Sequence, residues 1–438
     1  AMTTRSMTAW MLGNEARALL TRLAQVRSFA LGESMVPAAN LPPEAQVAIE
    51  RQLALGRNEL RKRVGDFQAW LQSPEGQKAT PDKMQRRFTF IRLRFNAVLS
   101  QFDLFSDVIT QRSENDTGVR LSGLDVAASD ALHLRDKFFP MPPIVCYLDR
   151  GAGAAIRRVR TRLPGGGENP VAIVRVPRER MVGSAIASSL VHEVGHQGAA
   201  LLNLVLSIRQ LLRARQQQPG DTEIWRLYER WISEILADFW SVAQVGVCST
   251  LGLMNVVSLP RIFVLRLNPE DPHPVPWIRV LISCAIGEAL YPHPQWQGLA
   301  GLWEAYYPLK GLEPPQRELF ERLRRSVKEF ASLLVNHKPA SLRGLTLAQA
   351  MPVAARQPER LAAHWRAWRK DPAAIRKAPP TLVFATLGQA KVDRQITPEQ
   401  EAALLSRQLT AWALRASVNR TAACAEREER LRVLFSTH

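Results

Sequence analysis

The stretch "SSLVHEVGHQGAALL", residues 188–202, decides how the centre of this chain folds. Its apolar residues recur at helical spacing, so we expect it to lie within one long helix over residues 184–218. Residues four apart on a helix share one face and lie about 6 Å apart. His192 and His196 can therefore direct both imidazoles at one ion. Glu193, rotated by about 100°, can reach a water on that ion without binding the ion itself.

The neighbours of these polar residues favour a metal site over an ordinary buried helix. Two histidines and a carboxylate in an apolar helix cost free energy to bury when they have no partners. Gly195 lies in the middle of the same helix, where a glycine costs about 1 kcal/mol relative to alanine. This glycine indicates either tight packing against a second helix or the close approach of a substrate, and the sequence favours neither.

A second polar pair lies downstream in "SEILAD", residues 233–238. A catalytic zinc site needs three protein ligands and one open position. Glu234 is far enough along the chain for a turn and a second helix to bring it back to the histidines. Asp238 lies on the same face one turn later, where it can accept the other ring N–H of a ligating histidine. We predict a Zn²⁺ site with His192, His196 and Glu234 as ligands. The alternative for the two acids is an exposed pair on an amphipathic helix.

These motifs resemble those of a known group of enzymes. HEVGH followed by Glu-x-x-Ala-Asp is similar to the gluzincin metallopeptidases, and most of all to the HtpX and CAAX prenyl protease family. The likeness covers about residues 140–285. It includes "DPHPVPWIRVLI", residues 271–282, which matches the His-Pro element of that family followed by an arginine. The resemblance implies a zincin-like core and a zinc endopeptidase, with Glu193 as general base on a metal-activated water.

The same resemblance makes His273 the first candidate for stabilising the oxyanion. Prolines flank it on both sides and stiffen its loop, and we expect Arg279 to anchor that loop through Asp271 or Glu270. His293, in "YPHPQW", is a weaker candidate of the same type. The unranked alternatives are four tyrosines: Tyr228, Tyr291, Tyr306 and Tyr307.

A strand before the metal-binding helix is the expected site of substrate alignment. "NPVAIVRVP", residues 169–177, is expected to lie at a sheet edge, because Pro177 prevents pairing on one side. In zincins the corresponding edge strand pairs with an extended peptide substrate. The residues that would align the substrate are then Ala172, Ile173, Val174, Arg175 and Val176.

The whole chain is predicted to be mainly α with a small β-sheet, an α+β fold. We expect a helical N-terminal region over residues 1–120, a zincin-like metallopeptidase core over 121–310 and a helical C-terminal region over 311–438. Further strands are predicted at 142–148 and at the start of 154–180, and residues 372–390 are predicted to form a proline-broken linker with one short strand. The other predicted helices cover 42–73 and 80–111, paired as an antiparallel hairpin, and 221–240, 314–337 and 397–435.

Composition limits the class of protein. The chain has 438 residues, of which 46% are hydrophobic and 22% charged, which is typical of a globular protein. The uncharged stretch 239–260 is long enough to span a bilayer, but its polar residues favour a buried helix and the turn that follows it. We therefore expect no membrane span. The four cysteines form no CxxC pair, which suggests free thiols in a reducing, cytoplasmic compartment.

Other functions compete with peptide hydrolysis. The net charge of +18 leaves a nucleic-acid partner open, although no dense basic run with interleaved aromatic residues is present and solvated helix faces explain the charge equally well. A zinc aminopeptidase and a metal-binding scaffold with a retained zinc site are further alternatives. Glu193 argues against a scaffold, which has no need of a base. The leading prediction is an endopeptidase acting on a protein or peptide substrate, and the sequence indicates no oligomeric state.

Overall fold

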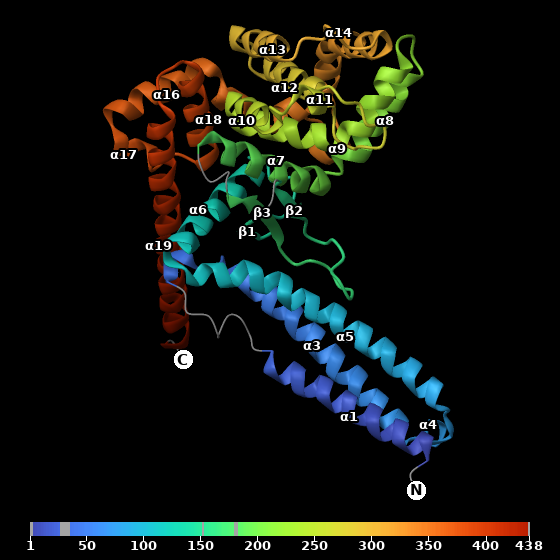
Figure 1. The fold of residues 1–438 in the computed structure, drawn as a ribbon. Helices are drawn as coiled ribbons and strands as arrows, with labels where there is room; N and C mark the ends of the chain where they lie inside the picture. Colours follow the sequence, from blue (N-terminus) through green and yellow to red (C-terminus); the bar gives the residue numbers. More distant parts are fainter. Residues whose placement is uncertain (1–2, 27–35, 151–152, 179–182, 437–438) are drawn as a thin grey trace. The chain divides into compact units, whose positions relative to one another are not determined.

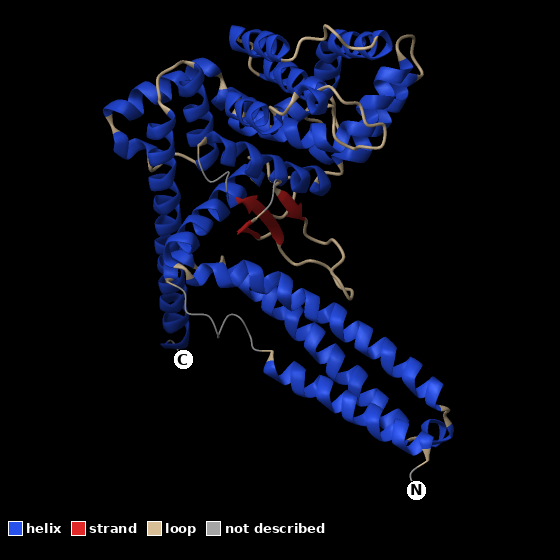
Figure 2. Cartoon of the chain, in the orientation of Figure 1, coloured by secondary structure: helices blue, strands red, loops and turns tan. Residues whose placement is uncertain are grey.

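The computed structural model describes residues 3–26, 36–150, 153–178 and 183–436 (Figure 1). These residues are mainly helical and include a single three-stranded sheet (Figure 2). The mainly α fold with a small sheet is therefore confirmed. Among the described residues, no helix is both long enough and apolar enough to cross a bilayer.

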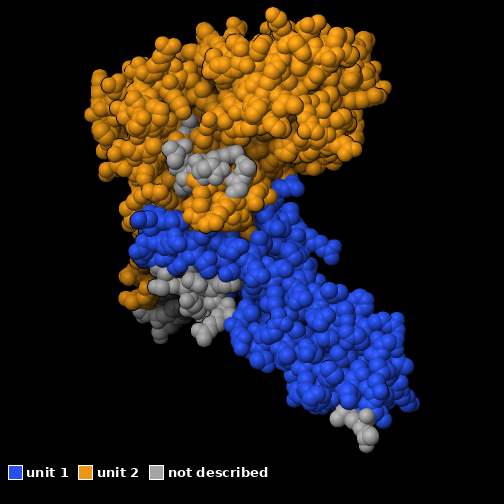
Figure 3. Space-filling view, in the orientation of Figure 1, with its two compact units in different colours: residues 1–119, 157–172 blue, residues 120–156, 173–438 orange. Residues whose placement is uncertain are grey.

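The chain divides into two compact units, coloured separately in Figure 3. One unit contains residues 1–119 and 157–172, and the other contains residues 120–156 and 173–438. The first division falls next to the expected boundary at residue 120. Most of the region expected to be the core lies in the second unit, together with the whole of the expected C-terminal region.

The first unit is built around three long helices that contact one another, α1, α3 and α5 (Figure 1). The two helices expected at 42–73 and 80–111 are present and in contact, and Phe67 packs on Phe88 with ring centroids 5.6 Å apart. Its elements are α1 (Thr4–Gln25), η1 (Pro37–Ala39), α3 (Pro43–Gln72), α4 (Pro74–Lys78), α5 (Pro81–Thr110) and η2 (Gln111–Ser113).

The second unit is organised around one long buried helix, α9, which contacts α7, α8, α10, α12, α14 and α18. Its helices are α6 (Asn115–Leu132), which leads in from the first unit, α7 (Ser184–Leu201), α8 (Leu204–Gln216), α9 (Thr222–Val245), α10 (Val247–Val257), α11 (Arg261–Val264), α12 (Pro276–Leu290), α13 (Pro294–Tyr306), α14 (Pro314–Asn336), η4 (Ala340–Leu342), α15 (Leu347–Ala350), η5 (Val353–Arg356), α16 (Pro358–Lys370), α17 (Pro372–Ile375), α18 (Pro380–Val392) and α19 (Pro398–Ser436).

The sheet contains β1 (Ile144–Asp149), β2 (Ala155–Arg157) and β3 (Ala172–Pro177), in the order β1-β3-β2. The three expected strands are present, but the expectation that β3 lies at the edge is wrong, because β3 is the central strand. Five of its six residues are buried, and Arg175 lies 3.7 Å from Asp149 of β1. A peptide could not add to β3 without displacing a neighbouring strand, so the aligning role expected for Ala172–Val176 loses its physical basis.

Two predicted helices are interrupted and one linker is helical. The helix expected over 184–218 is two helices, because Asn203 adopts a left-handed conformation with φ of 51° between α7 and α8. The stretch 239–260 forms the end of α9 and all of α10, separated by Gly246 with φ of 58°. Residues 372–390 form α17 and most of α18 and contain no strand. The prolines expected to break this segment occupy the first turns of its helices, where a missing N–H costs nothing.

Candidate metal centre

Helices α7 and α9 approach each other closely because α7 carries two glycines at their contact. A Cβ atom on Gly195 would lie 2.8 Å from Cβ of Trp240 and 2.9 Å from the carbonyl oxygen of Ala237. A Cβ atom on Gly198 would lie 2.4 Å from the Trp240 ring. Of the two explanations for Gly195, the structure shows helix packing. The Trp240 indole is fixed in turn by donating from Nε1 to the carbonyl of Ala131 at 2.8 Å.

This close contact brings the three predicted ligands together. His192 Nε2 lies 3.2 Å from Oε2 of Glu234, and His196 Nε2 lies 3.4 Å from Oε1 of the same carboxylate. The two imidazole rings are nearly perpendicular, at 88°, with centroids 4.9 Å apart. The three ligand atoms all lie within 4.8 Å of one another. Among the described residues, this is the cluster of histidine, cysteine and acidic side chains that could hold a metal ion.

The spacing of these atoms fits zinc. Zinc binds imidazole nitrogen and carboxylate oxygen at about 2.0–2.2 Å in a tetrahedron, so neighbouring ligand atoms should lie about 3.3 Å apart. The nitrogen–oxygen distances of 3.2 and 3.4 Å agree with this value. The three side chains are 13–18% exposed, so the cluster reaches solvent and a fourth ligand has access to it. Two imidazoles with one carboxylate form a donor set used by catalytic zinc sites.

Asp238 lies behind the cluster, as predicted. Its Oδ1 lies 2.8 Å from Nδ1 of His192, which leaves Nε2 of that ring to face Glu234. The Asp238 carboxylate is itself held by Arg279 of α12, whose Nε and Nη2 donate at 2.7 and 3.0 Å. The expectation that Arg279 anchors its own loop through Asp271 or Glu270 is therefore wrong. The sequence pointed to Arg279 but not to its partner Asp238, which lies 41 residues away in the chain.

The electrostatics of the cluster favour ionised acids. Burial of Asp238 opposes its ionised form, but Arg279 and His192 lower the pKa of its carboxyl to about 2. Burial likewise opposes ionisation of Glu234, yet hydrogen bonds from the two histidines hold its pKa well below the usual range. Burial opposes protonation of His192, but its bonds to Asp238 and Glu234 outweigh this and raise the pKa to about 9. In the absence of a metal, a proton on His192 therefore balances the acids.

Glu193 is placed differently from the ligands. It is 8% exposed on the same helix, and burial raises the pKa of its carboxyl, although the charges of His192 and His196 oppose the shift. A raised pKa brings a carboxylate closer to the neutral range in which a general base works best. Two acids beside one cluster thus have pKa values shifted in opposite directions, with Glu234 suited to binding a cation and Glu193 to exchanging a proton.

His273 lies at the cluster, on the loop that precedes α12. Its Nε2 lies 3.6 Å from Oε1 of Glu234, and its Nδ1 lies 2.8 Å from Asp271, which orients the ring. It is about half exposed, more than the three proposed ligands. His293 instead accepts from the backbone N–H of Gln295 and caps α13.

Three of the four candidate tyrosines form hydrogen bonds to groups outside the cluster. Tyr228 pairs with Ser326, Tyr291 donates to the carbonyl of Ala243, and Tyr307 donates to the carbonyl of Leu259. The fourth, Tyr306, is largely exposed.

Comparisons with known proteins assign the chain to no family. No family model matches the chain, and neither the curated proteins nor the solved structures contain a match. The sequence motif and the geometry of the cluster are therefore the features that point to a function.

Proposed function

We propose that the protein is a zinc-dependent endopeptidase of the gluzincin type. His192, His196 and Glu234 hold the metal, and Glu193 is the general base. The observation that carries the proposal is that the ligand atoms of two histidines and one glutamate lie within 4.8 Å of one another, beside a further buried acid, Glu193, that is not needed as a ligand. A site that only binds a metal has no use for that acid.

Each residue around the proposed metal has a different role in peptide hydrolysis. When bound, zinc supplies the Lewis acidity that lets water lose a proton near neutral pH. Glu193 accepts this proton and returns it to the leaving amine. Asp238 fixes the tautomer and direction of the His192 ring, and Arg279 keeps that carboxylate ionised. His273, oriented by Asp271, is the candidate donor to the developing oxyanion.

The substrate class in this proposal is a protein or peptide. The alternatives are a scaffold that binds metal without catalysis and a nucleic-acid-binding protein motivated by the net charge of +18. A DNA gel shift at several salt concentrations separates the last of these, because binding to phosphates weakens steeply with salt. A cytoplasmic location belongs to the same proposal and is supported by four free thiols.

The decisive experiment combines metal analysis with peptide hydrolysis. The parent protein should contain one zinc ion per chain, and His196→Ala should lose it. Glu193→Gln should retain the zinc and the fold but cleave a peptide library about 10²–10⁴-fold more slowly, because only the proton transfer is removed. His364→Ala, a histidine on α16 that packs on Trp368, is the matched control and should keep both properties.

Each contrary result has a distinct meaning. Zinc retained by His196→Ala would place the metal elsewhere in the chain. An unchanged rate in Glu193→Gln would refute the assigned base. A parent protein that binds zinc but cleaves no peptide in the library would favour the scaffold.

A further inference from the structure

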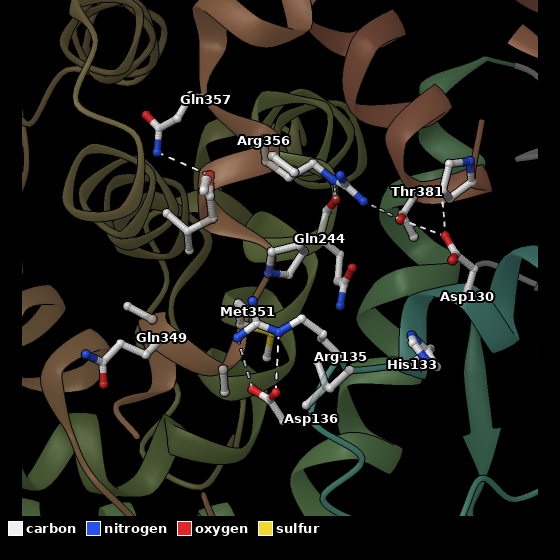
Figure 4. A pocket seen from close by; sticks show the side chains of 18 residues that line it. Asp130, His133, Arg135, Asp136, Gln244, Gln349, Met351, Arg356, Gln357 and Thr381 are labelled. Atoms are coloured by element: carbon white, nitrogen blue, oxygen red, sulfur yellow. Dashed lines mark hydrogen bonds and ion pairs between the residues drawn. The ribbon is translucent and has the colours of Figure 1, made fainter. Parts of the chain in front are cut away.

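One cavity in the unit that contains the metal cluster is lined by polar groups that take no part in the proposed metal chemistry. It has a volume of about 800 Å³, within the range of small-molecule pockets. Its walls come from residues 130–136, from residues 348–357 and from the end of α9 (Figure 4). Gln244 is the α9 residue in the wall, ten residues after Glu234, which is about 15 Å along the helix. The cavity is therefore separate from the metal cluster.

A buried cation without a direct acidic partner forms part of this wall. Arg356 is 7% exposed, and it donates from Nε to the backbone carbonyl of Gln244 at 2.8 Å and from Nη2 to the hydroxyl of Thr381 at 2.8 Å. Both partners are neutral. These bonds use two of the five N–H donors of a guanidinium. Burial of an arginine is costly unless an anion is near, and burial lowers the pKa of this one.

The Asp130 carboxylate is hydrogen-bonded to Thr381 rather than to Arg356. Oδ2 of Asp130 accepts from both the backbone N–H and the hydroxyl of Thr381, at 2.9 and 2.7 Å. Asp130 therefore acts on Arg356 from a distance and raises its pKa, while the Thr381 hydroxyl lies between the two side chains, as the dashed lines in Figure 4 show. The other cation of the wall, Arg135, is largely exposed and pairs with Asp136. Arg356 is thus a buried cation in this wall that forms no direct ion pair with any described residue.

A second donor in the same wall also lacks an acceptor. Gln244 is 2% exposed, and its side-chain Nε2 is buried without a hydrogen-bond partner among the described residues. An unsatisfied buried amide is expensive and is seldom kept without a reason. The backbone carbonyl of Gln244 is already bonded to Arg356, so the two unsatisfied donors belong to neighbouring residues. The Gln244 amide and the Arg356 guanidinium can both donate to a bound acceptor, and the charge of Arg356 favours an acceptor that is negatively charged.

Much of the remaining wall is apolar, including Leu134, Met351, Pro352 and Val353, although His133, Gln349 and Gln357 also line it. We propose that this cavity binds a small organic monocarboxylate with an apolar chain, whose carboxylate accepts from Arg356 and Gln244. A guanidinium without a direct ion pair can accept one carboxylate, whereas a phosphate dianion would add a larger surplus of negative charge near Asp130. A planar carboxylate also suits the fork of a guanidinium, and the apolar chain suits the rest of the wall.

The binding test uses the full chain and sodium hexanoate in isothermal titration calorimetry. We expect saturable binding at one site per chain. Hexanamide keeps the apolar chain without the charge and should bind at least about tenfold more weakly, because hydrogen bonds to a charged group are the stronger kind. Acetate should bind more weakly than hexanoate. Equal affinity for hexanamide, absence of saturation with hexanoate, or tighter binding of inorganic phosphate would each overturn the proposal.

Three variants locate the bound hexanoate. Gln244→Met removes the unsatisfied amide at nearly constant volume and keeps the backbone carbonyl that Arg356 needs. It should weaken hexanoate binding by about tenfold to a hundredfold without lowering the thermal midpoint of unfolding. Arg356→Met should abolish binding. Arg135→Met removes an exposed, paired cation from the same wall and should leave the affinity unchanged.

The same variants can refute the site. Arg356 also anchors two neighbours, so its replacement lowers stability, and Gln244→Met decides the matter if Arg356→Met does not fold. Unchanged hexanoate affinity in Gln244→Met would overturn the proposal, as would a loss confined to Arg135→Met. A carboxylate can also coordinate zinc, so His196→Ala is titrated as well. Binding that disappears in His196→Ala and persists in Gln244→Met would assign hexanoate to the metal cluster and refute the second site.

Discussion

Replacement of Gly195 by alanine tests whether the packing of α7 on α9 sets the geometry of the metal ligands. The new Cβ would lie 2.8 Å from Cβ of Trp240, whereas carbon atoms in good contact lie about 3.5–4.0 Å apart. The helices must therefore separate by about 0.7 Å or more at this point. Residue 195 lies between the two histidine ligands of α7, so the separation acts directly on their distances to Glu234.

The expected size of the effect differs for stability and for metal binding. Alanine gains about 1 kcal/mol over glycine inside a helix, whereas overpacking of a close contact costs about 1–3 kcal/mol. The free energy of unfolding should thus fall by no more than about 2 kcal/mol. Metal–ligand distances hold within about 0.2 Å, so a shift of about 0.7 Å is far outside that tolerance. We expect zinc affinity to fall at least tenfold.

The assay is a competition titration with a chromophoric zinc chelator, accompanied by urea unfolding of the metal-free protein. Gly301→Ala is the matched control, because Gly301 also lies inside a helix, α13, but a Cβ there meets nothing within 4 Å. This control should gain up to about 1 kcal/mol and bind zinc as the parent does. If Gly195→Ala instead behaves like Gly301→Ala in both measurements, the helix contact does not determine the cluster.

Three further predictions concern residues around the ligands. Asp238→Asn should weaken zinc binding by about 10–100-fold in the same titration, because His192 loses its anionic acceptor and Arg279 its counterion; unchanged affinity would show that the carboxylate does not act on the metal. The pKa of His192 is raised to about 9 in the folded, metal-free protein, so the stability from its protonation is complete below about pH 6.5 and is lost as the pH rises through 9. Urea unfolding in the presence of a chelator should show this loss between pH 6.5 and 9, and a flat profile would contradict it. His273→Ala should lower kcat by about 10²–10³-fold with KM and zinc content nearly unchanged, whereas a rise in KM alone would make His273 a substrate-binding residue.

Much of the proposed ligand set was predictable because helical periodicity places its residues in pairs on single helix faces. His192 and His196 are four residues apart on one helix, and Glu234 and Asp238 are four apart on another. The distances between such residues follow from the rise and pitch of the helix, whatever the rest of the fold. The sequence therefore indicated two faces that suit one ion. It also indicated the helix start at Asp221, whose side chain accepts from the backbone N–H of Ile224.

The features that could not be predicted depend on contacts between distant segments. Arg279 has several acids within reach along its own segment, and only the packing of α12 on α9 selects Asp238. A buried strand has the same apolar composition at an edge and at the centre of a small sheet, so β3 was misplaced. Asn203 can end a helix in the left-handed region or continue it, and nothing local to it decides which.

The link from His192 through Asp238 to Arg279 has a consequence for the kinetics of folding. The contacts of this carboxylate with His192 and Arg279 close loops of 46 and 41 residues, so each forms only when the two helices that it joins have docked. Contacts between residues so far apart are late and slow in folding, because the entropy of loop closure is lost before they stabilise the chain. Before α9 has docked on α7, only His192 and His196 of the proposed ligands are close enough together to bind zinc. Tight metal uptake is thus expected to report the docking of α9 and α12, and the rate of uptake to follow folding rather than the encounter of the ion with the chain.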